Sequence, residues 1–353
     1  MATSHYFHAE AHALTGRLNL PFEEQIKKQA FVKLEGESEK LLFEGDQKPL
    51  NEKRAPENYL SQHAKNYRLE GIISYSAAHT QVSGHRSKKD PTAFITLAAS
   101  SVENLNVLNV VTADRVVGQI STTHYPNQYS PKVTFLGTHF ENLRIAHHKT
   151  QPVLNLAFAG DRPEGKEAFY PTRGTSFITS LENQYERLRD YIRNLAAADR
   201  KVMRLDAEDS WLSKQYHGFS NFNYDELQSS ARAAAAKNGG KWDGVTGSLV
   251  EHVEIEDITI EKKGGDSFAT PPSARAFGHV IHVPDFGTIF LAELKVNHNS
   301  FDLTMIRLEL GCIVDGSVKI VTCSVNGGAG GGGNGSGLAG DAGTHDRRHL
   351  GAA

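Results

Sequence analysis

The sequence has few cysteines, no long apolar run and no large surplus of charge of one sign. Its 353 residues include only two cysteines, Cys312 and Cys323. A chain of this length can bury a core without disulfides. We expect two free, half-buried thiols, because only well-placed cysteine pairs can bridge. No uncharged apolar stretch approaches the roughly 20 residues that span a bilayer, so a transmembrane helix is not expected.

The ends of the sequence and its charge restrict location and partners. The N-terminus, MATSHYFHAEAHALTG, lacks the basic and then apolar segments of a secretory signal. We therefore expect a cytoplasmic or non-classically exported protein with no membrane insertion. A net charge of −3 with 22% charged residues implies neither nucleic acid nor an anionic membrane as a partner. An unknown protein or small-molecule ligand is expected, and homo-oligomerisation is left open.

Short strand-like segments fill most of the first 160 residues. In residues 5–13, Phe7, Ala9 and Ala11 alternate with polar side chains, as a half-buried strand requires. A polar, turn-rich segment follows at 35–65. Further short apolar runs are bounded by Gly, Pro, Asn or Ser; they lie at 69–75, 92–99, 105–120, 132–136 and 139–145. This pattern predicts a mainly β fold with an antiparallel β-sandwich or barrel-like body.

A helical pattern interrupts the strands. Thr179 and Glu182 have the spacing of a capping box, and Leu181, Tyr185 and Leu188 then recur at steps of four and three up to about residue 200. A second helix is predicted at about 224–237, ended by two glycines. Three units result: a discontinuous antiparallel β domain of residues 1–160 and 246–326, a helical insertion of residues 161–245, and a disordered Gly-rich tail of residues 327–353.

The last strands are predicted as hairpins. A two-residue turn at Asp315-Gly316 would pair Leu310 with Val321 and Leu308 with Cys323. In HVIHVPDFGTIFLAEL, His279 and His282 are three residues apart, so on a strand they leave opposite faces. We therefore predict a strand at 277–283, a turn through 284–287 and a second strand at 288–296, rather than a metal site.

Four segments in this order resemble the choice-of-anchor P family of β-rich bacterial proteins. They are ENLNVLNVVTADRV at 103–116, FENLRI at 140–145, VPDFGTIFLAEL at 283–294 and LTMIRLELGCIVDGSVKIVTCSVNGG at 303–328. The resemblance implies a bacterial β domain with no assigned activity and no catalytic residues to carry over. Family members are usually exported and surface-anchored, whereas this sequence shows neither a signal nor an apolar anchor, and its helical insertion lies outside the family pattern.

The candidate metal ligands are His8, Glu10 and His12, which project from one face of a predicted strand. Imidazole and carboxylate groups suit zinc or ferrous iron, but a solvated polar strand face gives the same alternation. His79 and His85 lead into a basic segment that could contact a phosphate or could be a solvated hairpin loop. No nucleophile elbow or C-x-x-C pair is found, so no catalytic or cofactor-binding residue is assigned.

These patterns favour a non-enzymatic β-rich structural or binding protein of unknown ligand. One alternative is a metal-dependent enzyme, a hydrolase or oxygenase, which uses the His8, Glu10 and His12 face with a transition metal as its cofactor. Another alternative is a self-assembling or exported bacterial protein in which the Gly-rich tail acts as a spacer or signal.

Overall fold

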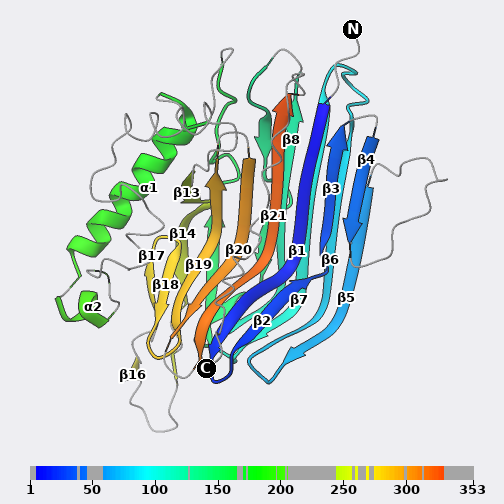
Figure 1. Ribbon diagram of the computed structural model, residues 1–353. Helices are drawn as coiled ribbons and strands as arrows, with labels where there is room; N and C mark the ends of the chain where they lie inside the picture. Colours follow the sequence, from blue (N-terminus) through cyan, green and yellow to red (C-terminus); the bar gives the residue numbers. More distant parts are fainter. Residues whose placement is uncertain are drawn as a thin grey trace, which may run out of the picture.

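Two antiparallel β-sheets pack face to face in the computed structural model, and a helix lies beside one edge of the stack (Figure 1). The mainly β prediction is confirmed in its sandwich form, since neither sheet closes into a barrel in the described ranges. The structure describes residues 5–37, 40–45, 59–125, 128–164, 170–171, 174–195, 197–202, 205, 244–256, 259–260, 268–269, 274–297, 300–311 and 314–329. The predicted helix at 224–237, Cys312 and residues 330–353 lie outside these ranges.

The ten-stranded sheet combines strands from both ends of the chain. Its order is β17-β18-β19-β20-β21-β1-β3-β4, with β13 on β19 and β2 on β1. The long strand β1 pairs along its length with β21, so the first and last described strands lie side by side. The bounds are β1 His5–Leu20, β2 Glu24–Gln29, β3 Val32–Glu37, β4 Lys40–Gly45, β13 Val245–Ser248, β17 Arg275–Phe277, β18 Val280–Val283, β19 Gly287–Val296, β20 Ser300–Leu310 and β21 Asp315–Ala329.

The nine-stranded sheet is mostly a run of hairpins along the chain. Its order is β14-β12-β11-β8-β7-β6-β5, with β9 and β10 on β8. Strand β1 packs on β6 and β7, while β21 packs on β7 and β8. The bounds are β5 Tyr59–Leu69, β6 Ile73–Arg86, β7 Phe94–Val107, β8 Val111–His124, β9 Lys132–Thr134, β10 His139–Glu141, β11 Arg144–Ile145, β12 His148–Leu154 and β14 Val250–Ile255. A separate pair is formed by β15 Thr259–Ile260 and β16 Phe268–Ala269.

Helix α1 (Ser176–Arg193) is followed by the short α2 (Ala197–Val202). The predicted apolar face is confirmed, because Leu181, Tyr185 and Leu188 are buried. The predicted start is wrong: the N-cap is Thr175, whose Oγ1 accepts a hydrogen bond from the Ile178 N–H at 3.3 Å. The helix thus begins one turn before the Thr179–Glu182 pair. The Tyr185 hydroxyl donates to the Thr246 carbonyl at 2.7 Å, which fixes α1 against β13.

One row of residues breaks the alternation of four adjacent strands of the ten-stranded sheet. The register gives Ala13, Val321, Met305 and Ala292 no ladder partner, although the rows on either side are paired. Two of the four, Ala292 and Val321, have positive φ values of 46° and 56°. In each strand, the residue of this row and one of its neighbours along the chain are both fully buried. A regular strand with one face in the core would bury only one of two successive residues. The alternation of inward-pointing and outward-pointing side chains therefore reverses at this row, which we call the kink row.

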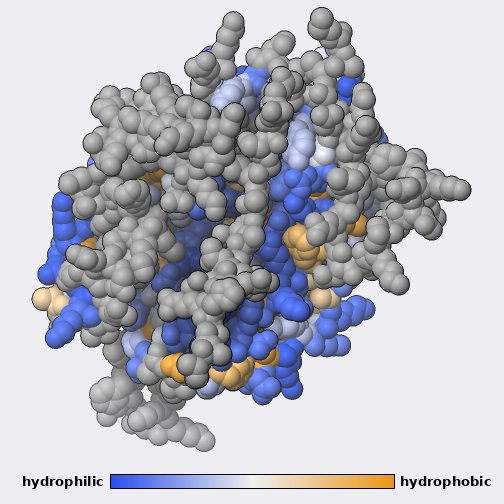
Figure 2. Space-filling view, viewed as in Figure 1, coloured by the Kyte–Doolittle hydropathy of each residue, from blue (hydrophilic) through white to orange (hydrophobic). Residues whose placement is uncertain are grey.

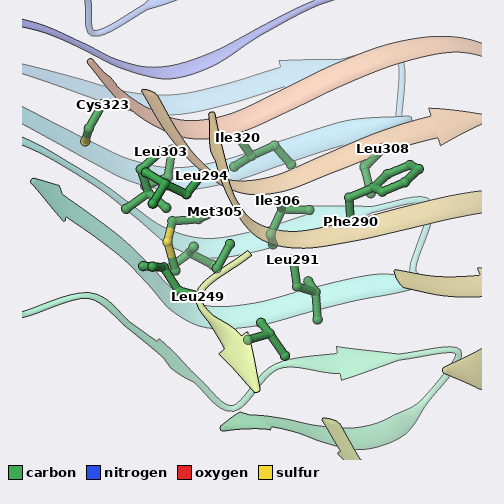
Figure 3. Close-up of a cluster of buried hydrophobic side chains, with 14 of the residues drawn as sticks. Leu249, Phe290, Leu291, Leu294, Leu303, Met305, Ile306, Leu308, Ile320 and Cys323 are labelled. Carbon is green, nitrogen blue, oxygen red and sulfur yellow. The ribbon is translucent and has the colours of Figure 1, made fainter. Parts of the chain in front are cut away.

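The facing sheet supports the kink row. The Ser100 hydroxyl donates to the His12 carbonyl at 3.1 Å, and the Cys323 thiol donates to the Gly118 carbonyl at 3.2 Å. Figure 3 shows Met305, Ile306 and Ile320 in the buried apolar cluster between the sheets. Cys323 is free, as predicted, but it is fully rather than half buried, and burial raises the pKa of its thiol.

Three hairpins of the nine-stranded sheet share one repeated pattern. Asn66, Asn104 and Asn142 follow at intervals of 38 residues, and all three have positive φ values. Four and five residues later each hairpin makes its turn with two further positive-φ residues, as a type I′ turn requires; the pairs are Glu70-Gly71, Leu108-Asn109 and Ala146-His147. The Nδ2 groups of Asn104 and Asn142 donate to Ser76 at 2.8 Å and Asp114 at 2.6 Å. Ser76 and Asp114 hold the same repeat position, so successive units are joined in the same way.

Several predicted boundaries are corrected by these turns. The runs 69–75 and 105–120 are not single strands, because each contains a type I′ turn. The segment around His79 and His85 is strand β6 rather than a loop, and a Cβ on its Gly84 would meet Phe7 at 2.7 Å. The segment 35–65 includes strands as well as turns.

The closing hairpin has a different register from the predicted one. Leu310 pairs with Gly316 and Leu308 with Val318, so Asp315 and Gly316 lie in β21 instead of the turn. Gly316 is needed because a Cβ there would clash with the Arg17 carbonyl of β1. Strand β21 also continues to Ala329, three residues into the range predicted to be disordered. At 275–296 the predicted turn and second strand are confirmed, but Gly278 and His279 form a turn that splits the first strand.

Gly118→Val should destabilise the fold, because a Cβ at Gly118 would lie 2.9 Å from side-chain carbons of Met305 and Val321. We expect a loss of about 1–3 kcal/mol in the free energy of unfolding, measured with urea. Gly311→Val is the matched control, because a Cβ at Gly311 would meet no other atom within 4 Å. Equal stability of the two variants would contradict the close packing of the kink row.

Two buried histidines meet between the sheets at one end of the sandwich. The rings of His5 and His124 are 5.1 Å apart, and His5 stacks on Phe94 at 4.7 Å. Burial, and then repulsion from His124, lowers the pKa of His5 to about 3, and burial lowers the pKa of His124 to about 4. Both rings are therefore neutral in the folded state at neutral pH.

Acid should weaken the fold through these rings. Below about pH 6.5 the unfolded chain binds protons at both histidines, while the folded chain does not until near pH 4, so stability falls with falling pH. The decrease in the free energy of unfolding from pH 7 to pH 5 should be roughly 2 kcal/mol smaller in His124→Phe than in the wild type. His85→Gln serves as control, because the His85 ring is not buried. If the free energy of unfolding falls as much in His124→Phe as in the wild type, this explanation is wrong.

Candidate functional site

The outer face of the ten-stranded sheet carries a dense set of polar and charged side chains. Two cross-strand rows lie next to each other across β1, β21, β20 and β19. The first contains Glu10, Ser324, Asp302 and Lys295, and the second contains His12, Thr322, Thr304 and Glu293. Figure 2 views the molecule from this side, and hydrophilic residues are visible near its centre. We call the residues of these two rows the polar face.

Arg307 is the most tightly held charge beside this face. Its Nε donates to Glu293 Oε2 at 2.6 Å and its Nη2 to Glu293 Oε1 at 3.0 Å, and its Nη1 donates to Glu309 Oε1 at 2.6 Å. The guanidinium carbon lies 3.5 Å from the centroid of the Phe290 ring. Arg307 and Glu293 are only 4% and 7% exposed, so the pair is screened little by solvent. Burial alone would raise the pKa of Glu293, but Arg307 holds it below its ordinary value.

The kink row brings these groups together. Thr304 and Arg307 are three residues apart on β20, so regular alternation would put them on opposite faces. Because the phase reverses at Met305, Arg307 instead reaches Glu293, the cross-strand neighbour of Thr304. Sequence reasoning could not pair Arg307 with Glu293, because no local signal marks the reversal.

The predicted ligands His8, Glu10 and His12 do lie on this outer face. The Glu10 carboxylate forms an ion pair with Lys28, and His12 Nδ1 lies 3.7 Å from Glu10 Oε1. Despite the effect of burial, the adjacent His12 and Lys28 lower the pKa of Glu10 to about 2. Burial lowers the pKa values of His8 and His12. Across the described ranges, no group of three or more His, Cys, Asp or Glu side chains could hold a metal ion; metal binding here stays a prediction.

The environment of Asp302 shifts its pKa in the opposite direction to that of Glu10. Burial raises the pKa of Asp302, and the hydrogen bond with Ser324 offsets only part of this effect. A carboxyl group of this kind can accept a hydrogen bond or, when protonated, donate one. The polar face thus presents hydroxyl, imidazole and carboxyl groups side by side.

A cavity of about 200 Å³ lies between α1, β14 and the β17–β18 turn. Gln184, Tyr191 and His252 line it, together with His279, whose pKa is lowered to about 4 by burial. This volume is below the roughly 300–1,000 Å³ typical of small-molecule sites. We therefore take the polar face, which extends over four strands, as the better candidate for a site that takes a sizeable ligand.

Removing Arg307 should be costly, because Glu293 would remain as a buried carboxylate without its guanidinium. We expect Arg307→Met to lower the free energy of unfolding by about 3–5 kcal/mol, and the double variant with Glu293→Leu to recover most of that loss. Denaturant titration measures both. Arg193→Met, which breaks an exposed pair with Asp190, should change stability by less than about 1 kcal/mol. A similarly small effect of Arg307→Met would contradict the assigned role of the pair.

The comparisons with known proteins add a family but no function. No curated protein and no solved structure matches the chain. In the described ranges no helix is long and apolar enough to cross a membrane. The resemblance to the choice-of-anchor P proteins is not tested by these findings and stays a prediction. One family model, described as "Domain of unknown function (DUF8256)", matches residues 58–297, more than half of the sequence. The chain therefore belongs to the DUF8256 family.

Proposed function

We propose that the protein is a non-enzymatic binding protein that takes a neutral, polyhydroxylated ligand, such as an oligosaccharide, on the polar face. The observation that carries the proposal is the pair of cross-strand rows in which hydroxyl groups lie between charged ones. Ser324 lies between Glu10 and Asp302, and Thr322 and Thr304 lie between His12 and Glu293. Such a surface offers donors and acceptors at the spacing of adjacent strands, roughly 5 Å.

The charge pattern selects against ligands with a strong charge of one sign. The carboxylates of Glu10 and Glu293 are close to the cations of Lys28 and Arg307. A polyanion would meet the carboxylates and a polycation would meet the ammonium and guanidinium groups, so either would be repelled in part. A neutral ligand with many hydroxyl groups can bond to both kinds of group without that penalty.

The ion pairs also favour binding over catalysis. General acid–base or nucleophilic catalysis needs a group that is free to exchange a proton or attack a substrate. Glu10, Glu293 and Glu309 are instead engaged by cations, which fix their side chains. Side chains held in place before binding lose less entropy when a ligand arrives. This arrangement suits a preformed recognition surface.

The test is a binding screen with the purified full-length chain against immobilised neutral and anionic oligosaccharides, followed by calorimetry on any hit. We expect neutral saccharides to bind, and Ser324→Ala and Thr322→Val each to weaken binding by about 1–2 kcal/mol, or about 5–30-fold. Ser121→Ala and Thr123→Val make the same substitutions on β8 of the other sheet and should leave affinity unchanged. Binding of anionic saccharides alone, no binding, or equal losses in both variant pairs would overturn the proposal.

A further inference from the structure

Two histidines face each other on the outer side of the nine-stranded sheet. His63 of β5 and His79 of β6 are direct cross-strand partners. Their ring centroids are 4.3 Å apart, with 41° between the ring planes. The His63 side chain is exposed and the His79 side chain is half-buried, so the edges of both rings remain open to solvent. The antiparallel ladder holds the two rings together without any contribution from loops.

The repeat shows that this pair is particular to the first hairpin. His63, Ser101 and His139 each lie three residues before the repeated asparagine of their hairpin. In the second hairpin the cross-strand partner of Ser101 is Val117, and in the third unit the position equivalent to His79 is Asn155. Among these equivalent positions, only the first hairpin has a histidine on both strands. His139 instead bonds to the Gly137 carbonyl at 2.7 Å and to Glu141 at 2.9 Å.

We propose that His63 and His79 together bind one divalent transition-metal ion, preferentially Cu²⁺, with water in its remaining coordination positions. Imidazole nitrogens bind such ions at roughly 2.0–2.1 Å, which puts the centres of two rings bound cis to one ion roughly 4.5–5 Å apart. The observed 4.3 Å needs only a small rotation of either side chain. Copper is preferred because N-donor sites bind Cu²⁺ more tightly than the other divalent first-row ions.

The local charges suit binding and also limit it. Burial, and then the neighbouring His63 and Arg115, lower the pKa of His79. Arg115, and Lys65 two residues after His63 on β5, add positive charge near the site. These cations oppose a metal ion by repulsion. The pair should therefore be a copper site of moderate affinity, open enough for a further ligand to reach the ion.

Titration of the purified, chelator-treated full-length chain with Cu²⁺ alone tests the site. Calorimetry measures affinity, and the nitrogen hyperfine pattern in electron paramagnetic resonance reports the number of bound imidazoles. We expect the first equivalent of Cu²⁺ to bind most tightly and to be coordinated by two imidazole nitrogens. His63→Asn and His79→Asn should each weaken that binding by at least about tenfold, and the double variant should be no worse than either. Circular dichroism checks that the variants fold.

Two further variants locate the ion. His139→Asn changes the repeat-equivalent histidine that lacks an imidazole partner, and His8→Asn changes the candidate ligand set on the opposite sheet. Both variants should leave the affinity for the first equivalent of Cu²⁺ within about twofold of the wild-type value. The proposal is overturned if wild-type protein takes up no such equivalent, if His63→Asn and His79→Asn bind copper like the wild type, or if only His8→Asn abolishes binding.

Discussion

The kink row of Ala13, Val321, Met305 and Ala292 determines much of this structure. At this row four neighbouring strands bury two successive residues, and two of the four residues have positive φ values. Non-glycine residues rarely adopt that conformation, and the surrounding structure must compensate for the strain. The compensation comes from the facing sheet, where Gly118 leaves room for Met305 and Val321 and where Ser100 bonds to the His12 carbonyl. The two sheets therefore depend on each other at this row.

The position of Arg307 beside the polar face follows from the same reversal of phase. Arg307 points outward only because the strand alternation changes at Met305, and it then meets Glu293 from the neighbouring strand. A buried ion pair of this kind contributes little net stability but imposes a large cost when one partner is lost. Its effect is to fix the positions of charges next to the hydroxyl-bearing rows. The ion pair beside the proposed recognition surface is thus a consequence of how the core is packed.

The nine-stranded sheet is organised by the hairpin repeat instead. Its units are joined by asparagine side chains at equivalent positions, and each turn uses two positive-φ residues. Repeated backbone geometry holds equivalent side chains in line across the strands, so a change at one position alters the outer surface without disturbing the ladder. The histidine pair of the first hairpin is such a change. It lies within the segment that defines the DUF8256 family, whereas β1, β20 and β21 of the polar face lie outside it.

The sequence by itself determined the β-rich class, the buried face of β1, the apolar stripe of α1 and the turn at 284–287, because these depend on local periodicity and turn chemistry. The 38-residue spacing of Asn66, Asn104 and Asn142 was also readable, although only the positive φ values show its meaning. Tertiary structure alone decided the register of β20 with β21, the kink row and the pairing of Arg307 with Glu293. Each of these depends on contacts between segments far apart in the chain, where a close approach such as that of Gly316 to Arg17 outweighs the local preference of Asp-Gly for a turn.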